Sequence, residues 1–317
     1  MDDFEENTKK RAAPRRMGYL RRLLLLVCVA VLCFSGYHLV TGLLEYKKGT
    51  DLYDDIEHTY VSTPTPTPTP VPGAPTPTPV VTPTPPPLPE ITGPEEEIPD
   101  DTPPPGPGEE DEDEPPSKPS KPEQLAPDIW PVVDFEGLLS VNPDTEAWII
   151  CPGTNINYPV VHSHDNADYL TTMFNLTYGR AGSLFIDMRN KYGFADRNTI
   201  IYGHNMRNHS MFWTLTRYKA QSYYNAHPTM RLILPDGNYE LQLFAGFVAE
   251  ESEGEVWRTK FASDEAFIDW IKAAFARSTF RSYVNLEESD HVVTLSTCSY
   301  EFTGARYVVM GKLVKVS

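Results

Sequence analysis

The chain has 317 residues, a formal net charge of −17, 31 prolines and four cysteines. Its densest acidic runs, at 95–97 and 109–114, lie among the prolines, where they indicate a solvated, self-repelling linker. The rest of the chain has no basic patch interleaved with aromatic residues, which argues against nucleic-acid binding. Four cysteines without a Cys-x-x-Cys pair form neither a disulfide framework nor a metal motif. We expect no metal and no cofactor.

The N-terminal region has the pattern of a membrane anchor. Residues 23–44 contain no charged side chain, and their length suits a membrane-spanning helix. Lysines and arginines concentrate in the preceding tail, 1–22, which by the positive-inside rule stays in the cytoplasm. A cleaved signal peptide is the alternative, but its apolar core is normally shorter and followed by a small-residue cleavage site. We therefore predict a single-pass cell-membrane protein with the later residues outside.

Residues 45–127 are rich in proline and threonine, and include the acidic runs. Alternating Thr-Pro favours an extended polyproline II conformation, and so polar a composition cannot build a core. We interpret this range as an extracellular linker that holds the following domain away from the membrane. A ligand for proline-binding modules is the alternative.

Apolar and aromatic residues collect in 128–317, enough for one folded domain. A short helix is expected at 132–140. Short β-branched or aromatic segments between turn residues predict eight strands: 147–151, 158–161, 183–186, 199–202, 230–234, 239–248, 291–298 and 305–316. Further helices are expected at 210–217 and at 263–277, the second capped by Ser263. The pattern predicts a mainly β, barrel-like domain with a late inserted helix.

Cys298 is the candidate nucleophile because it ends a predicted strand and a polar turn follows it. A cysteine nucleophile reacts as the thiolate, so it needs a cationic or basic neighbour. Cys151 ends an apolar run and is interpreted as a buried core residue. A Cys151–Cys298 disulfide is the alternative.

His204 is the first candidate for the basic partner, because it follows an apolar strand and a glycine. His209 is the second candidate. His291 shares the strand of Cys298 and is about 23 Å away along an extended chain, which excludes it. Arg306 opens the next strand, and a reversal over 299–305 would bring its guanidinium beside the sulfur, where it can stabilise an oxyanion. A surface arginine at a strand start is the alternative.

Together these segments resemble the sortases, the cell-wall sorting cysteine transpeptidases of Gram-positive bacteria. The run 294–298 (Thr-Leu-Ser-Thr-Cys) with Arg306 resembles the sortase Thr-Leu-x-Thr-Cys…Arg signature. The run 202–206 (Tyr-Gly-His-Asn-Met) resembles the sortase histidine motif. The Leu-Ser-Thr-Cys form, the run 152–161 and the helix at 263–277 resemble class B. The resemblance implies that 128–317 is a sortase catalytic domain: a closed β-barrel with a short N-terminal helix and a helix inserted before the last two strands.

The resemblance also implies a reaction. Cys298 would attack the threonine carbonyl of a sorting signal on a surface protein and form a thioacyl-enzyme. His204 would protonate the departing amine and deprotonate the incoming one, while Arg306 would hold the substrate and its oxyanion. Ser296 and Thr297 are expected to line the groove. The acceptor amine would belong to a peptidoglycan cross-bridge or to a pilin lysine.

Competing functions remain open at this point. An L,D-transpeptidase would need a Ser/Thr-His-Gly-Cys run, and a papain-like peptidase would place its cysteine ahead of its histidine. A non-enzymatic wall-spanning adhesin fits the Thr-Pro stretch but gives no reason for these residues at strand ends. An acidic segment at 250–255 raises the alternative of a calcium loop; we interpret it as solvated. It contains Glu250, Glu251, Glu253 and Glu255.

Overall fold

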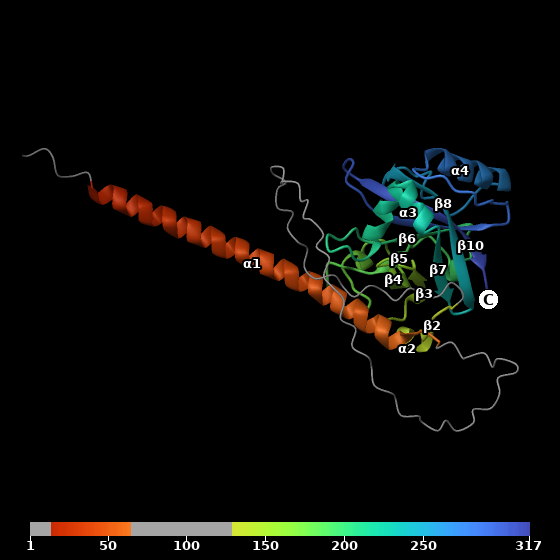
Figure 1. Ribbon diagram of the computed structural model, residues 1–317, viewed down its shortest axis with the longest axis horizontal. Coiled ribbons are helices and arrows are strands. Elements are labelled where there is room, and N and C mark those ends of the chain that lie inside the picture. Colours follow the sequence, from red (N-terminus) through yellow and green to blue (C-terminus); the bar gives the residue numbers. More distant parts are fainter. Residues whose placement is uncertain (1–13, 65–128) are drawn as a thin grey trace, which may run out of the picture. The chain divides into compact units, whose positions relative to one another are not determined.

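The computed structural model describes residues 14–64 and 129–317 (Figure 1). Its α-helices are α1 (Pro14–Tyr60), α2 (Phe135–Val141), α3 (Gln221–Ala226) and α4 (Asp264–Arg277). Three 3₁₀ helices are η1 (Asp168–Leu170), η2 (Tyr192–Phe194) and η3 (Phe212–Lys219). The strands are β1 (Val61–Ser62), β2 (Val132–Val133), β3 (Thr145–Ile150), β4 (Asn157–His162), β5 (Leu184–Ile186), β6 (Asn198–Tyr202), β7 (Thr229–Leu234), β8 (Gly237–Glu250), β9 (His291–Cys298) and β10 (Ala305–Lys315).

Strands β3 to β10 form a closed barrel in the order β10-β8-β7-β3-β4-β5-β6-β9. The sheet is mixed, because β4 pairs with β5 and β6 pairs with β9 in parallel, whereas the other pairs are antiparallel. Closure leaves no free edge in this sheet. The predicted mainly β barrel is therefore confirmed, with each of the eight expected strands present.

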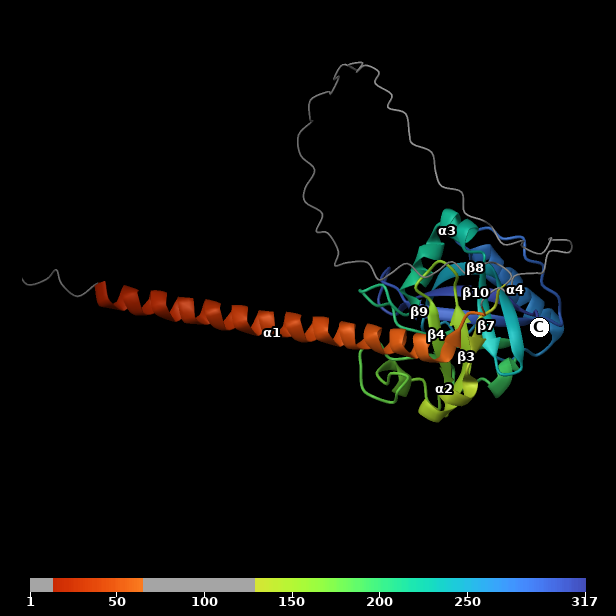
Figure 2. The ribbon, with the colours of Figure 1, turned by 60° about the horizontal axis from the view of Figure 1, so that its bottom comes forward.

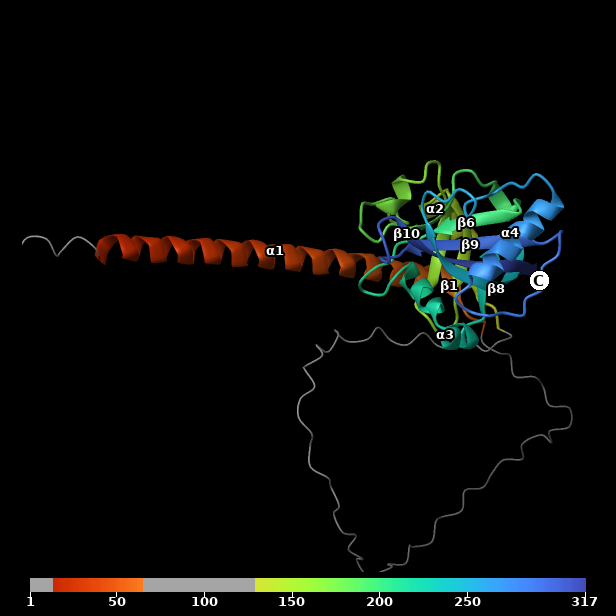
Figure 3. The same cartoon turned by 90° about the horizontal axis from the view of Figure 1, so that it is seen from above.

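Helix α4 is the predicted helix inserted before the last two strands. Ser263 caps it by accepting a hydrogen bond from the backbone N–H of Ala266. Its apolar face buries Phe267, Ile271 and Ala274 against a second core outside the barrel, formed with β8, β9 and β10. Figure 3 shows α4 beside these strands. This face has the helical spacing of an ordinary packed helix.

The N-terminal part of the structure differs from the sequence prediction in two respects: the length of its first helix and the start of the linker. The short helix predicted at 132–140 is present as α2, but it is preceded by α1, which is 47 residues long. Within α1 lies an apolar span with mean hydropathy 2.4, long enough to cross a membrane. The helix then continues to Tyr60, so residues 45–60 are helical, although the sequence analysis placed 45–127 in a linker. The remainder of that linker, 65–127, lies outside the described residues.

The last turns of α1 are helical because they pack on the barrel. Gly49, Tyr53 and Ile56 are buried and recur at helical spacing, so they form one face. The Tyr53 hydroxyl donates a hydrogen bond to the carbonyl of Gly182, and its ring meets that of Tyr158 edge-on at 5.3 Å between centroids. Burial raises the pKa of Tyr53 to about 12. Figure 2 shows this end of α1 beside β3 and β4.

Strand β1, directly after α1, pairs with β2 in an antiparallel ladder that matches Val61 with Val133. The backbone N–H of Asp134 also donates to the carbonyl of Tyr60 at 2.8 Å. The described residues that end at Pro64 and those that begin at Ile129 are therefore joined by a pair of hydrogen-bonded strands.

The docking of α1 predicts that Tyr53→Phe destabilises the full-length protein. The variant leaves the Gly182 carbonyl without its buried donor, a loss of about 1–2 kcal/mol. The melting temperature should fall by about 4 °C. Tyr178→Phe is the matched control, since that side chain is exposed. Equal melting temperatures for the two variants would contradict the docked arrangement.

Candidate active site

Cys298 and Arg306 face each other at one end of the barrel. Cys298 is the last residue of β9 and Arg306 the second residue of β10, and the two are paired across the ladder. The turn between them closes at Gly304, whose φ of +79° favours glycine. The Arg306 guanidinium lies with Nη1 3.4 Å from Cys298 Sγ. The reversal expected from the sequence thus brings a permanent cation to a partly exposed thiol.

His204 reaches the same end of the barrel through β6. Because β6 runs parallel to β9, with Tyr202 opposite Ser296, the carboxyl ends of both strands lie together. Gly203 permits this approach, since a Cβ at that position would collide with the side chains of Leu184 and Phe212. The His204 Nε2–H donates to the carbonyl of Leu170 at 2.6 Å. In the neutral ring this bond leaves Nδ1 as the nitrogen free to accept a proton.

Two polar contacts join the segments that carry the cysteine and the histidine. The Asn205 side-chain amide donates to the Cys298 carbonyl at 2.8 Å. The Thr297 hydroxyl donates to the Gly203 carbonyl at 2.8 Å. Ser296 is also buried, but its hydroxyl has no hydrogen-bond partner within the described residues. Thr297 therefore links the two segments, whereas the Ser296 hydroxyl is a buried polar atom without a partner beside the same strand end.

Cys298, His204 and Arg306 line one cavity of about 420 Å³. Its wall carries polar, apolar and aromatic side chains from several strands and loops. The other lining residues are Asn166, Leu170, Phe185, Asp187, Arg189, Tyr202, Gly203, Glu251, Gly254, Trp257, Ser296 and Thr297.

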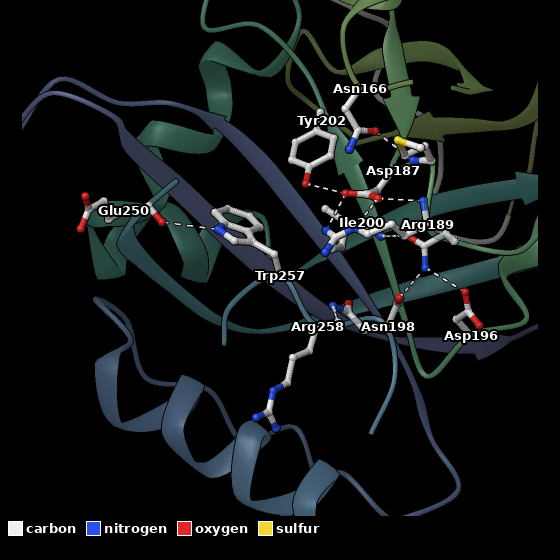
Figure 4. Close-up of polar contacts among 12 residues, drawn as sticks. Asn166, Asp187, Arg189, Asp196, Asn198, Ile200, Tyr202, Glu250, Trp257 and Arg258 are labelled. Atoms are coloured by element: carbon white, nitrogen blue, oxygen red, sulfur yellow. Dashed lines mark hydrogen bonds and ion pairs between the residues drawn. The ribbon is translucent and has the colours of Figure 1, made fainter. Parts of the chain in front are cut away.

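A buried carboxylate organises one wall of this cavity. Asp187 accepts two hydrogen bonds from the Arg189 guanidinium, at 2.8 and 2.7 Å, and one from the Tyr202 hydroxyl at 2.8 Å. Figure 4 shows the three side chains pointing toward one another, with Trp257 nearby. Burial by itself would raise the pKa of Asp187, but the bonds from Arg189 and Tyr202 outweigh it and lower the pKa.

This balance predicts a pH-dependent cost for Asp187→Asn. A folded-state pKa below the unfolded value means that ionised Asp187 stabilises the fold at neutral pH. That contribution is lost as pH falls through the folded pKa. Urea unfolding should therefore show the variant less stable than the wild type at pH 7, with the difference narrowing below about pH 4. The exposed Asp269→Asn is the control, and a pH-independent difference would contradict the assignment.

The two remaining sequence candidates lie elsewhere. Cys151 is buried and its sulfur lies 3.5 Å from the Tyr218 hydroxyl, so the core role expected for it is confirmed. All four cysteines are free, which excludes the alternative disulfide. His209 stacks on Trp213 at 3.8 Å between ring centroids and does not line the Cys298 cavity.

The contrast between the two cysteines predicts selective labelling. Burial raises the pKa of the Cys151 thiol, so little thiolate forms there at neutral pH, whereas Cys298 is accessible beside a guanidinium. Brief iodoacetamide treatment of the full-length protein at pH 7, followed by peptide mapping, should modify Cys298 and spare Cys151. In Cys298→Ala, no cysteine of the barrel should be modified. Modification of Cys151 at a comparable rate would contradict this picture.

Sequence reasoning missed the supporting contacts. Three of these contacts depend on strand register and on how loops close, which the sequence does not specify: the ion pairs Asp187–Arg189 and Glu251–Arg306, and the hydrogen bond from Asn205 to Cys298. A signal for the first was the Asp-x-Arg spacing after a predicted strand. No local pattern pointed to Glu251, which lies 55 positions from its partner.

Comparisons with known proteins agree with this geometry. The family model described as "Sortase domain" matches residues 149–314. The chain is 36% identical over 185 residues to Sortase B of Staphylococcus aureus (strain NCTC 8325 / PS 47), covering 58% of this chain and 75% of the relative. It is 36% identical over 183 residues to Sortase B of Listeria monocytogenes serovar 1/2a, covering 57% and 74%.

Solved structures give the same result. The Staphylococcus aureus sortase B–substrate complex superposes with a TM-score of 0.55 at 36% identity, covering 58% of this chain and 85% of that one. A structure of sortase B complexed with triglycine superposes with a TM-score of 0.54 at 36% identity, covering 58% and 86%.

Proposed function

Because the chain belongs to the sortase family and is a sortase B-type cysteine transpeptidase, we propose that it joins surface proteins to an amine through Cys298. The substrate would be a C-terminal sorting signal cleaved after threonine. The observation that carries the proposal is the Cys298–Arg306 contact of 3.4 Å, in a cavity that His204 also lines. Family membership removes the reason to consider a non-enzymatic adhesin.

In the first step the Cys298 thiolate attacks the threonine carbonyl carbon. The carbon–sulfur bond forms as the carbonyl π electrons move to oxygen, and collapse of the intermediate expels the amine of the next residue. That leaving nitrogen takes a proton from protonated His204. The product is a thioester between Cys298 and the N-terminal part of the substrate.

In the second step an acceptor amine attacks the thioester. Neutral His204 removes the proton from the attacking nitrogen as the new amide bond forms and the Cys298 thiolate leaves. Each turnover therefore exchanges one amide bond for another and returns His204 to its protonated form. The hydrogen bond from His204 Nε2–H to Leu170 would hold the ring in one orientation through both steps.

Arg306 would stabilise the negative charge that develops on the carbonyl oxygen. Its guanidinium is permanently charged and already directed at Cys298 Sγ, so little reorganisation is needed when the oxyanion forms. Ser296 would contribute through its place in the cavity lining, with its hydroxyl buried behind that wall. Thr297 would contribute through its position on the cavity wall.

The substrates are proposed from relatives and from chemistry. A sortase B structure contains a substrate and another contains triglycine, which supports a sorting signal as donor and a glycine amine as acceptor. We propose the amine of a peptidoglycan cross-bridge as the acceptor. A pilin lysine is the competing acceptor.

Helix α1 would anchor the enzyme in the membrane. Arg21 and Arg22 precede its apolar span, and by the positive-inside rule the N-terminus would lie in the cytoplasm and the barrel outside. A signal sequence is the competing role for such a helix. The docked turns around Tyr53 support the anchor, because they are continuous with that span and form part of the fold.

Intact mass measurement tests the proposed reaction. Full-length protein in detergent is incubated with a panel of sorting-signal peptides, alone or with triglycine or a lysine peptide. The expected result is an adduct equal to the N-terminal part of one peptide, which is transferred to triglycine.

Three variants assign the roles. Cys298→Ala should form no adduct, whereas His204→Ala and Arg306→Ala should each slow acylation by about 10²-fold or more. Absence of any adduct on folded, reduced protein would overturn the proposed donor class. Transfer to the lysine peptide alone would replace the cross-bridge amine by a pilin lysine.

A further inference from the structure

The acidic segment at 250–255 begins with the last residue of β8, and most of its glutamates form ion pairs with arginines. Glu253 accepts from both Nη atoms of Arg277, and Glu255 lies 2.6 Å from Arg258. Glu251 accepts a 2.6 Å hydrogen bond from Nη2 of Arg306. Three of the four glutamates are thus ion-paired, and one of them holds the arginine of the active site.

The backbone fixes the position of Glu251. The β8–β10 ladder pairs Arg306 with Ala249, and the N–H of Glu251 extends it by donating to the Gly304 carbonyl at 3.0 Å. A Cβ at Gly304 would lie 3.4 Å from Cγ and Cδ of Glu251, so the glutamate side chain lies over this glycine. The backbone of Glu251 is therefore fixed beside the start of β10, and its side chain extends over Gly304 toward Arg306.

The Arg306 guanidinium makes distinct contacts with its two Nη atoms. Nη2 meets the Glu251 carboxylate, while Nη1 lies 3.4 Å from Cys298 Sγ and 3.4 Å from the Ala305 carbonyl. We propose that Glu251 is a positioning residue, which holds the fork of Arg306 so that Nη1 stays directed at the reacting sulfur. The proposal rests on the catalytic role proposed above for Arg306.

Stability alone does not explain this ion pair. The side chains of Arg306 and Glu251 are 28% and 57% exposed, and pairs this accessible add little to folding. An unpaired arginine side chain, however, samples many rotamers. When a charged group in an active site is displaced even slightly, it loses much of its ability to stabilise the transition state. A single exposed carboxylate can therefore orient the guanidinium even though it adds little to the stability of the fold.

The carboxylate also has an electrostatic effect that the amide of glutamine lacks. Its negative charge offsets part of the positive potential of Arg306 at Cys298. Among the described residues, the other charged or titratable groups around the cysteine are His204 after β6, Tyr202 with the Asp187–Arg189 pair of the cavity wall, and the Lys219–Glu301 pair beyond Ser299. None of these changes when Glu251 is substituted, so the two effects can be separated.

The test compares Glu251→Gln and Glu251→Ala with Glu253→Ala in the full-length protein. Glutamine keeps an acceptor for Arg306 Nη2 and removes only the charge, whereas alanine removes both. Glu253→Ala is the matched control from the same loop, because its partner is Arg277. Steady-state kinetics with a cleaved sorting peptide and the pH profile of Cys298 alkylation by iodoacetamide are the two measurements.

With Glu251→Ala we expect kcat to fall about tenfold and KM to change less than twofold, since orientation matters most in the transition state. Glu251→Gln should stay within about threefold of the wild-type kcat. Its half-maximal alkylation should occur at lower pH than in the wild type, because the offsetting charge is gone. Half-maximal alkylation of Glu251→Ala should occur at higher pH than that of Glu251→Gln, because Arg306 is no longer held.

Three results would overturn the proposal: a Glu251→Ala kcat within twofold of the wild type, an equal loss in Glu253→Ala, or identical alkylation profiles for the two Glu251 variants. A loss confined to KM would also overturn it, since Glu251 would then contact substrate. Alkylation needs no sorting signal. It therefore decides the role of Glu251 even if every peptide fails and the proposed donor class is wrong.

Discussion

The position of β9 in the closed barrel determines the whole site. This strand pairs in parallel with β6 on one side and antiparallel with β10 on the other. Parallel pairing brings the end of β6, and with it His204, to the end of β9. Antiparallel pairing brings the beginning of β10, and with it Arg306, to the same point. Cys298 lies between them because it is the last residue of the shared strand.

That arrangement explains how much of the molecule could be predicted. Strand positions follow from short β-branched segments bounded by turn residues, and the helix capped by Ser263 follows from its apolar spacing. Cys298, His204 and Arg306 could be chosen because they occupy strand ends and match a known signature. The resemblance supplied the closed barrel, but the order of strands around it was not predicted, since local sequence does not specify which strands pair.

What could not be predicted depends on tertiary contacts. The helix expected at 210–217 is the 3₁₀ helix η3, which begins at Phe212 after Met211, a residue with a φ of +55°. The helical nature of 45–60 was hidden by its charges and by its nearness to the Thr-Pro runs. Its buried residues Gly49, Tyr53 and Ile56 have helical spacing. That spacing could be recognised as a buried helix face only once the surface of the barrel that covers it was known.

The pairing of β1 with β2 bears on whether the residues between them determine the distance of the barrel from the apolar span. Pro64 and Ile129 flank strands that are bonded to each other, and the docked face of α1 begins a few residues after its apolar span. From Leu44 to Tyr53 the helix rises about 14 Å, at 1.5 Å per residue. With α1 as the proposed anchor, the height of Cys298 above the bilayer would be set by a helix and its packing. Under that proposal, homologues could gain or lose Thr-Pro repeats between β1 and β2 without changing the distance from the apolar span to Cys298.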